Sequence, residues 1–190
     1  DEPIRTMGQL IWRYHPESHL FELFAEGGWN TFGVDFDDQG RVYSGTNGNL
    51  QAVYFVQDGF YQKGFGKHGP HTNPYAFGYF GGLPIKGENV RIVHQWIHYN
   101  SGAIPSLEGL LVGGNSLASK VHALRMEPDG SSFKTVEAAN PIKTDHKWFR
   151  PVHCTAGPDG AIYFSDFYDA RITHVDPRDN WDRERGRIIR

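Results

Sequence analysis

Short segments that alternate apolar and polar residues recur along the chain, separated by turns that contain glycine. Residues 34–44 predict a strand, a turn at Gly40 and a second strand, because glycine tolerates positive φ and aspartate can bond its own backbone. Residues 154–165 repeat this pattern around Gly160, 120 positions after Gly40. No segment keeps apolar residues at helical spacing over three turns. The pattern predicts an all-β protein built from repeated hairpins.

A second type of hairpin alternates with the first. Residues 11–24 form one copy, residues 121–136 form another, and a third copy is predicted to begin at residue 171. Residues 107–113 supply a further strand with its turn. Two alternating hairpin types are typical of a β-propeller, whose blades are four-stranded antiparallel sheets. A sandwich of two facing sheets is the main structural alternative.

The spacing of these hairpins divides the chain into blades. We expect an outer half-blade at 10–27, full blades at about 32–63 and 90–139, and most of a blade from 148 on. The Gly- and Pro-rich stretch at about 64–87 is interpreted as a loop insertion over one face. The 190 residues are therefore expected to form a single partial β-propeller domain, a partial ring of about three to four blades. Propellers usually have about four to eight blades, so the chain is a fragment or its ring is completed by another chain.

The composition excludes several classes of protein. The net charge is −3, from 19 basic and 22 acidic residues, without the basic excess of a nucleic-acid-binding protein. The most apolar stretches, such as residues 110–112, are strand-sized, so no membrane span is predicted. The single cysteine, Cys154, excludes an internal disulfide and a C-x-x-C-H site, so no covalent haem is expected in this chain. Residues 1–5 lack a signal-peptide pattern, and an export signal is expected to have been removed or to lie upstream.

Several strings of residues carry a resemblance to a known family; they are residues 21–37, 64–75, 148–152, 165–169 and 176–183. In this order they resemble the large bacterial membrane-bound dehydrogenases, whose propeller is often followed by a helical region and a haem-binding domain. The resemblance implies a secreted or periplasmic, extracellular location. It also implies that electrons pass to a haem domain in the full-length protein.

A weaker similarity, on residues 100–113 and 150–160, links the chain to the soluble quinoprotein glucose and sorbosone dehydrogenases. These enzymes are six-bladed propellers, so the resemblance implies a fragment of a six-bladed ring. It also implies a sugar or alcohol substrate and, as cofactors, pyrroloquinoline quinone and calcium. The metal ligands are unknown, because the quinoprotein calcium loop is not recognisable after residues 45–48.

The resemblance assigns cofactor-binding positions to two residues. Asn30 falls where a cofactor-contacting asparagine is expected, and Arg150 falls on the first of two arginines at the mouth of a later blade. Trp29 and Val152 occupy positions where the resemblance expects arginines. The histidine that accepts the substrate proton in such enzymes falls on an earlier blade, outside this chain.

Four residues form the candidate site. His68 and His71 could ligate a metal or shuttle protons, or they could bond backbone groups in a surface loop. Arg150 opens a predicted inner strand and could bind a carboxylate or quinone oxygen, or pair with a nearby aspartate, Asp166 or Asp169. Asn30 points to the same channel or forms an Asx turn.

Other groups receive structural interpretations. Asp35, Asp37 and Asp38 could collect calcium, but a polar strand face with its turn is favoured. The aspartates and arginines between residues 176 and 185 are interpreted as a salt-bridged surface connection. Cys154 is expected to be buried and inert. The aromatic residues between 60 and 80 are expected to pack between blades.

Two functions follow from these expectations. The first is a segment of a quinoprotein-like sugar or alcohol dehydrogenase, with His68, His71 and Arg150 as catalytic residues and Asn30 and Arg150 as cofactor ligands. The second is a non-catalytic propeller that binds glycans or a protein partner, which Trp29 and Val152 favour.

Overall fold

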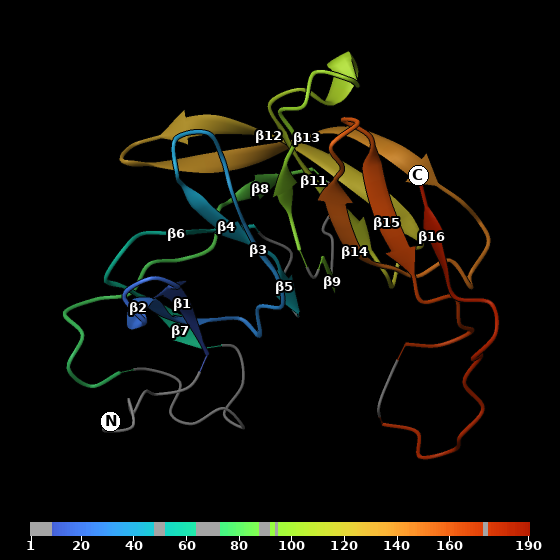
Figure 1. The fold of residues 1–190 in the computed structure, drawn as a ribbon, viewed down its shortest axis with the longest axis horizontal. Helices are drawn as coiled ribbons and strands as arrows, with labels where there is room; N and C mark the ends of the chain where they lie inside the picture. The colour runs from blue at the N-terminus through green and yellow to red at the C-terminus, as the bar shows by residue number, and fades with distance from the viewer. Residues whose placement is uncertain (1–8, 48–51, 64–72, 88–91, 94, 173–174) are drawn as a thin grey trace.

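The computed structural model describes residues 9–47, 52–63, 73–87, 92–93, 95–172 and 175–190. Strands in these residues form four successive sheets (Figure 1). The first sheet contains β1 (Leu10–His15), β2 (Leu20–Gly28) and β7 (Gly59–Lys63), and the second contains β3 (Val34–Phe36), β4 (Val42–Ser44) and β6 (Val53–Phe55).

The third sheet is the largest. Its antiparallel centre is formed by β10 (Ile97–His98), β11 (Leu110–Asn115), β12 (Lys120–Asp129) and β13 (Ser132–Lys143). Its edges carry β5 (Thr46–Asn47), β8 (Ile85–Lys86) and β9 (Ile92–Val93), and a short 3₁₀ helix (Pro105–Leu107) lies between β10 and β11. The fourth sheet contains β14 (Pro151–Ala156), β15 (Ile162–Asp166) and β16 (Arg187–Ile189).

The sheets are arranged as blades of an open ring. The strands β3, β10 and β14, one from each of three sheets, lie side by side, because β10 contacts both β3 and β14. The His98 N–H donates to the Asp35 carboxylate at 3.0 Å, which joins β10 to β3. From this shared region the sheets spread outward without closing a circle (Figure 1). The all-β, partial-propeller prediction is confirmed.

The core consists of three apolar layers, one between each pair of successive sheets. Consecutive residues of β11 serve different layers: Leu111 packs toward the second sheet, and Val112 packs toward the fourth. This alternation follows from the two-residue period of a strand. β11 is therefore buried on both faces.

The two predicted turns have the same geometry. In one, the Asp37 N–H donates to the Arg41 carbonyl and the Gly40 N–H donates to the Asp37 carbonyl; in the other, the N–H groups of Gly157 and Gly160 donate in the same way. Gly40 has φ of 73° and Gly160 has φ of 75°, a region that favours glycine. The predicted repeat is confirmed at both positions.

One predicted full blade is corrected. The blade expected at 32–63 has three strands among the described residues, because β7 leaves it and pairs in parallel with β2. Gly27 explains this pairing: a Cβ there would lie 1.7 Å from the Tyr61 carbonyl oxygen, so only glycine lets the two backbones approach. By contrast, the blade expected at 90–139 contains the four antiparallel strands β10 to β13.

The third copy of the second hairpin, predicted from residue 171, was wrong. Residues 171–172 and 175–186 form no strand, and β16 takes the place beside β15. The Asp169 carboxylate accepts the N–H groups of Arg171 and Asp182, at 3.1 and 2.7 Å. Such side-chain bonds compete with a strand ladder for the backbone donors.

The insertion proposed at 64–87 stays a prediction, because residues 64–72 lie outside the described part. Residues 73–87 run beside the first sheet and then add β8 in parallel to β13. Tyr61 is buried as expected, but Tyr75 and Phe77 are exposed, so their expected packing between blades was wrong.

The two-sided burial of β11 generates a prediction. Leu111→Ala is expected to lower the free energy of unfolding by about 2–5 kcal/mol, because it leaves a cavity in a closed layer. Leu117→Ala, at an exposed position just after the same strand, is the control and is expected to cost less than about 1 kcal/mol. Urea unfolding measures both. Equal losses would contradict a core on this face of β11.

Candidate functional site

Arg150 lies at the start of β14 and is buried between the third and fourth sheets. Its guanidinium donates to three backbone carbonyls, each at 2.9 Å: Nη1 to Ser116, Nε to Asp169 and Nη2 to Ala170. Ser116 directly follows β11, so the side chain joins the third sheet to the connection after β15. Burial lowers the pKa of Arg150, while Asp169 and Asp166 act in the opposite direction.

The two aspartates expected to pair with Arg150 hold its backbone surroundings instead. The Asp166 carboxylate accepts the Arg150 N–H at 2.7 Å and the Tyr168 N–H at 3.0 Å, and it pairs with Arg187 at 3.0 Å. Asp169 anchors the connection that leads away from the site. These carboxylates fix the backbone on which the guanidinium rests.

A pocket of about 380 Å³ opens beside Arg150. Its polar lining consists of Ser119, Thr144, Asp145, Lys147 and Arg150, and small or aliphatic residues complete it. The described bonds use three of the five guanidinium N–H donors. Two cations and two hydroxyl groups stand against the one carboxylate of Asp145, and this excess of positive charge suits a carboxylated small molecule.

Thr144 and Lys147 had not been singled out from the sequence. The sequence marks them only by their position in the connection just before β14.

A second pocket, of about 610 Å³, lies between the third and fourth sheets. Its lining is mainly aliphatic, and its charged groups, Asp159 and Arg190, pair with each other at 2.9 Å. The smaller pocket therefore holds more groups able to do chemistry.

The other predicted site residues do not lie in the Arg150 pocket. His68 and His71 fall outside the described residues. Asn30, between β2 and β3, has φ of 56°, a left-handed conformation that asparagine tolerates. It is not among the residues that line the pocket. The roles assigned to Asn30, Arg150, His68 and His71 stay predictions.

The carboxylates considered for calcium are bonded to protein groups. Asp37 accepts the N–H groups of Gln39 and Arg41, the Arg41 guanidinium at 2.6 Å and the Tyr43 hydroxyl at 3.2 Å. Asp35 accepts from His98, as described above. The described residues contain no cluster of three or more His, Cys, Asp or Glu side chains that could hold a metal. The bonds of Asp35 and Asp37 agree with the interpretation of these residues as a strand face and its turn.

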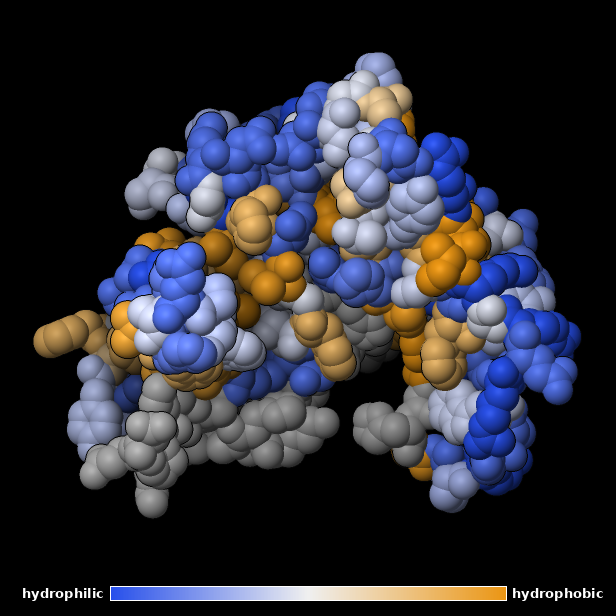
Figure 2. All heavy atoms as spheres, in the orientation of Figure 1, coloured by the Kyte–Doolittle hydropathy of each residue, from blue (hydrophilic) through white to orange (hydrophobic). Residues whose placement is uncertain are grey.

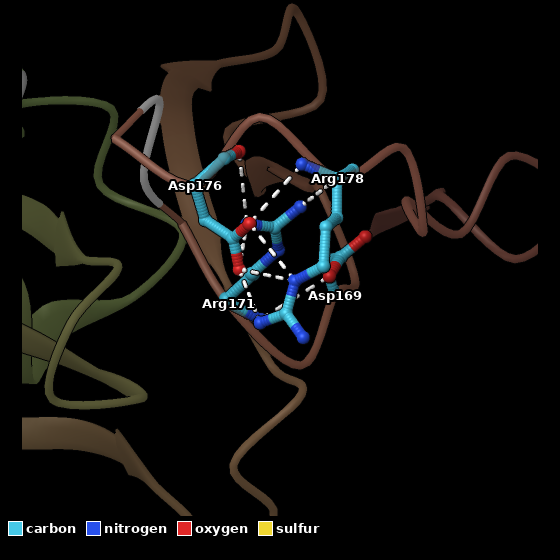
Figure 3. A network of polar contacts seen from close by, with 4 residues as sticks. All are labelled: Asp169, Arg171, Asp176 and Arg178. Atoms are coloured by element: carbon cyan, nitrogen blue, oxygen red, sulfur yellow. Dashed lines mark hydrogen bonds and ion pairs between the residues drawn. The ribbon is translucent and has the colours of Figure 1, made fainter.

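The salt-bridged connection after β15 is confirmed (Figure 3). Asp176 pairs with Arg178 at 2.6 Å and with Arg171 at 3.1 Å. The other two aspartates of the segment are also paired, Asp179 with Arg183 and Asp182 with Arg185. These pairs are mostly exposed, so they order the connection more than they stabilise the fold.

Cys154 is fully buried in the layer between the third and fourth sheets, as expected. Burial raises the pKa of its thiol to about 12. The thiol therefore stays protonated at neutral pH, which keeps it unreactive.

The fold and these contacts define a partial β-propeller with a buried arginine beside a small polar pocket. A family model described as "Domain of unknown function (DUF7133)" matches residues 97–190, which cover the four strands β10 to β13 and the fourth sheet. No curated protein matches the chain significantly.

No helix in the described residues has the length and apolar character that crossing a membrane requires.

Solved sugar dehydrogenases share the fold. A glucose dehydrogenase aligns with a TM-score of 0.53 over 76% of this chain and 43% of its own, at 15% identity. The soluble aldose sugar dehydrogenase of Escherichia coli, in its apo form, aligns with a TM-score of 0.50 over 76% and 44%, also at 15% identity. The chain thus spans less than half of the length of these proteins. At this identity the similarity establishes the fold alone.

The contacts of Arg150 generate a prediction about stability. Arg150→Met is expected to lower the free energy of unfolding by roughly 3 kcal/mol, because three backbone carbonyls, two of them in buried bonds, lose charged donors. Arg13→Met removes an exposed pair with Glu22 and is expected to cost less than about 1 kcal/mol. Chemical denaturation compares the two variants. A loss at Arg150 no greater than that at Arg13 would contradict its bridging role.

The bonds of Asp37 generate a prediction about pH. Burial disfavours its charged form, but the hydrogen bonds from Arg41 and Gln39 outweigh burial and lower the pKa below its usual 3.8. A lowered carboxyl pKa stabilises the folded state above the unfolded pKa, and this contribution disappears as pH falls through the folded pKa. Asp37→Asn is therefore expected to be less stable than the original protein at pH 6, with a difference that shrinks toward pH 2.5.

Urea midpoints across that pH range test the Asp37 prediction. Asp38→Asn is the matched control, because Asp38 is an exposed neighbour whose carboxylate accepts a bond from the Asn100 side chain. It is expected to lose less stability at pH 6 than Asp37→Asn, because Asp37 accepts four hydrogen bonds from its own turn. A pH-independent deficit in Asp37→Asn would refute the charge-based explanation.

Proposed function

We propose that this chain is a propeller segment of a quinoprotein-like dehydrogenase that oxidises a sugar or related alcohol. The observation that carries the proposal is the Arg150 pocket, in a fold shared with glucose and aldose sugar dehydrogenases. The resemblance of the sequence to bacterial dehydrogenases points in the same direction. The proposal concerns the whole protein, since the chain spans less than half of such an enzyme.

The pocket chemistry fits the carboxylate groups of pyrroloquinoline quinone. Arg150 and Lys147 would bind those carboxylates, and Ser119 and Thr144 would offer hydroxyl donors. When bound, the quinone would supply the acceptor for the two electrons removed from the sugar. The described residues offer no cluster for calcium, so no ligands are assigned to it.

The remaining site residues enter as part of the proposal. His68 or His71 would accept the substrate hydroxyl proton, and Asn30 would contact the cofactor across the open channel. A single cysteine leaves no covalent haem in this chain, so electrons would pass to a haem domain in the full-length protein. We place the protein in the periplasm or outside the cell.

A second function is favoured by one observation. The Arg150 guanidinium already donates hydrogen bonds to three backbone carbonyls, as expected of an arginine with a purely structural role. In that case the propeller would be non-catalytic and bind glycans or a protein partner. Binding to a glycan array without any sugar oxidation would support this alternative.

The dehydrogenase proposal predicts sugar-dependent dye reduction. The full-length protein that contains this chain, loaded with pyrroloquinoline quinone and calcium, is expected to reduce a dye with at least one aldose. Arg150→Lys keeps the charge but loses the forked geometry, and it is expected to lower quinone affinity and activity at least tenfold. Arg13→Lys, on the exposed first sheet, is expected to change neither.

Two measurements make this test decisive. Quinone binding is followed by fluorescence quenching separately from turnover, and unfolding curves verify that Arg150→Lys is folded. The absence of reduction above the quinone-free control, across a broad panel of aldoses and alcohols, would refute the proposal.

A further inference from the structure

Three side chains form a cluster of polar and aromatic groups near the Arg150 pocket. The Tyr168 hydroxyl and the His146 Nε2 atom lie 3.1 Å apart, within hydrogen-bonding distance. The centres of the Tyr168 and Trp148 rings lie 5.6 Å apart. His146 is exposed, and the two aromatic residues are half-buried. None of the three lines the pocket, so the His146–Trp148–Tyr168 cluster is a separate feature of the structure.

The cluster and the pocket share one backbone connection. Two residues that line the pocket, Asp145 and Lys147, alternate along the chain with His146 and Trp148. The Trp148 carbonyl accepts the Asp169 N–H at 3.1 Å, so this connection continues the pairing of β14 with β15. The cluster therefore stands directly beside the pocket.

Asp166 ties Tyr168 to the backbone of Arg150. Its Oδ1 atom accepts both N–H groups, from Arg150 at 2.7 Å and from Tyr168 at 3.0 Å. Asp166 shares its face of the fourth sheet with Phe164, two positions earlier on β15, which packs toward the third sheet. The pocket lies on the same side, because the turn between β11 and β12 supplies part of its lining. One carboxylate thus holds the cluster and the pocket on one side of the fourth sheet.

Tyr168 has an unusual backbone conformation. Its φ is 48°, in the left-handed region, which is costly for a bulky side chain. The bond from its N–H to Asp166 holds this conformation, and the Arg187 guanidinium lies 4.4 Å from the centre of its ring. Such outliers concentrate at binding and catalytic sites, where the surrounding structure maintains them. The conformation of Tyr168 therefore supports a functional role for the cluster.

The arginines around the cluster are neutralised by aspartates. Arg187 pairs with Asp166 at 3.0 Å. Arg185, which lies 5.5 Å from the centre of the Trp148 ring, pairs with Asp182 at 2.6 Å. Figure 2 shows mainly hydrophilic surface over the connection after β15, at the lower right of the molecule. The cluster is therefore polar with balanced charges and suits an uncharged ligand, whereas the neighbouring pocket has an excess of positive charge and suits an anion.

The cluster keeps hydrogen-bonding groups that the protein leaves available. Among the described residues, the His146 Nδ1 atom and the Trp148 indole N–H have no hydrogen-bond partner. The Tyr168 hydroxyl can make further bonds, since a hydroxyl carries one donor and two acceptor sites. Ligand sites combine aromatic surface with a few such polar groups. A pyranose sugar matches this combination, because its C–H face packs on an aromatic ring while its hydroxyls both donate and accept.

We propose that His146, Trp148 and Tyr168 form a subsite for an uncharged pyranose sugar, beside the pocket that takes the anionic cofactor. The sugar ring lies on Trp148, and its hydroxyl groups bond His146 and Tyr168. This inference rests on the proposed function, because a sugar dehydrogenase holds its substrate next to its cofactor. It assigns the two ligands to two neighbouring sites of different charge.

Sugar binding to the quinone-free protein tests the subsite. Saturation-transfer NMR on the full-length protein that contains this chain is expected to show binding of D-glucose, D-galactose or D-xylose. Tyr168→Phe keeps the ring but removes the hydroxyl, and it is expected to raise the Kd of the bound sugar about fivefold, the effect of one neutral hydrogen bond. Trp148→Leu removes the aromatic face and is expected to raise this Kd at least fivefold.

Tyr163→Phe is the matched control. It also removes a bonded tyrosine hydroxyl from the fourth sheet, but this hydroxyl donates to Asp159 at the opposite end of β15. Its sugar affinity is expected to equal that of the original protein. Urea unfolding verifies that all variants are folded, so a loss of affinity is not mistaken for a loss of structure.

The outcomes separate the subsite from the dehydrogenase proposal. Sugar binding that weakens in Tyr168→Phe and Trp148→Leu, without any dye reduction, would support the subsite and refute the dehydrogenase. Dye reduction with an unchanged KM for the sugar in both variants would overturn the subsite and leave the dehydrogenase standing. The subsite would also be overturned if none of the three sugars bound.

Discussion

Face-to-face packing of successive sheets is the interaction on which the rest of this structure depends. A sheet that stood alone would leave at least one apolar face in water, so each sheet buries that face against a neighbouring sheet. The third sheet resolves this by directing Leu111 to one neighbour and Val112 to the other. Its two buried layers hold the second and fourth sheets at fixed positions. The inner strands β3, β10 and β14 therefore meet in one region, which gives the fold its channel side.

Arg150 contributes to the same packing of successive sheets, because it joins the third sheet to the connection that follows β15. Layers of aliphatic side chains leave the backbone ends of neighbouring sheets with carbonyls that require donors. One guanidinium reaches three of them, from Ser116 to Ala170, and so joins two sheets with a single side chain. The burial that makes this bridge useful also places a cation at the edge of a pocket. A structural role and a binding role are compatible here, because the described bonds use three of its five donors.

Local features were predictable from the sequence, and non-local pairings were not. The turns at Gly40 and Gly160 follow from residue chemistry within four positions, and so do the ion pairs from Asp176 to Arg185. The parallel pairing of β7 with β2 depends on the approach of Tyr61 to Gly27, more than thirty positions apart, which no local pattern encodes. The false hairpin at 171 has a related cause, since Asp169 captures backbone donors that its strand-like pattern would have used.

The candidate site was likewise predictable in its local part and not in its non-local part. Arg150 was identified from its place at the start of an inner strand, but its carbonyl partners come from segments 19 to 34 positions away. The pocket beside it is lined by residues of this chain alone, so the anion binding that we propose there needs no other blade. The channel bordered by β3, β10 and β14 differs, because only a closed ring gives it an opposite wall. The binding of a carboxylated ligand that we propose at Arg150 would therefore need only this chain, whereas a reaction that excludes water from the channel would need the complete ring.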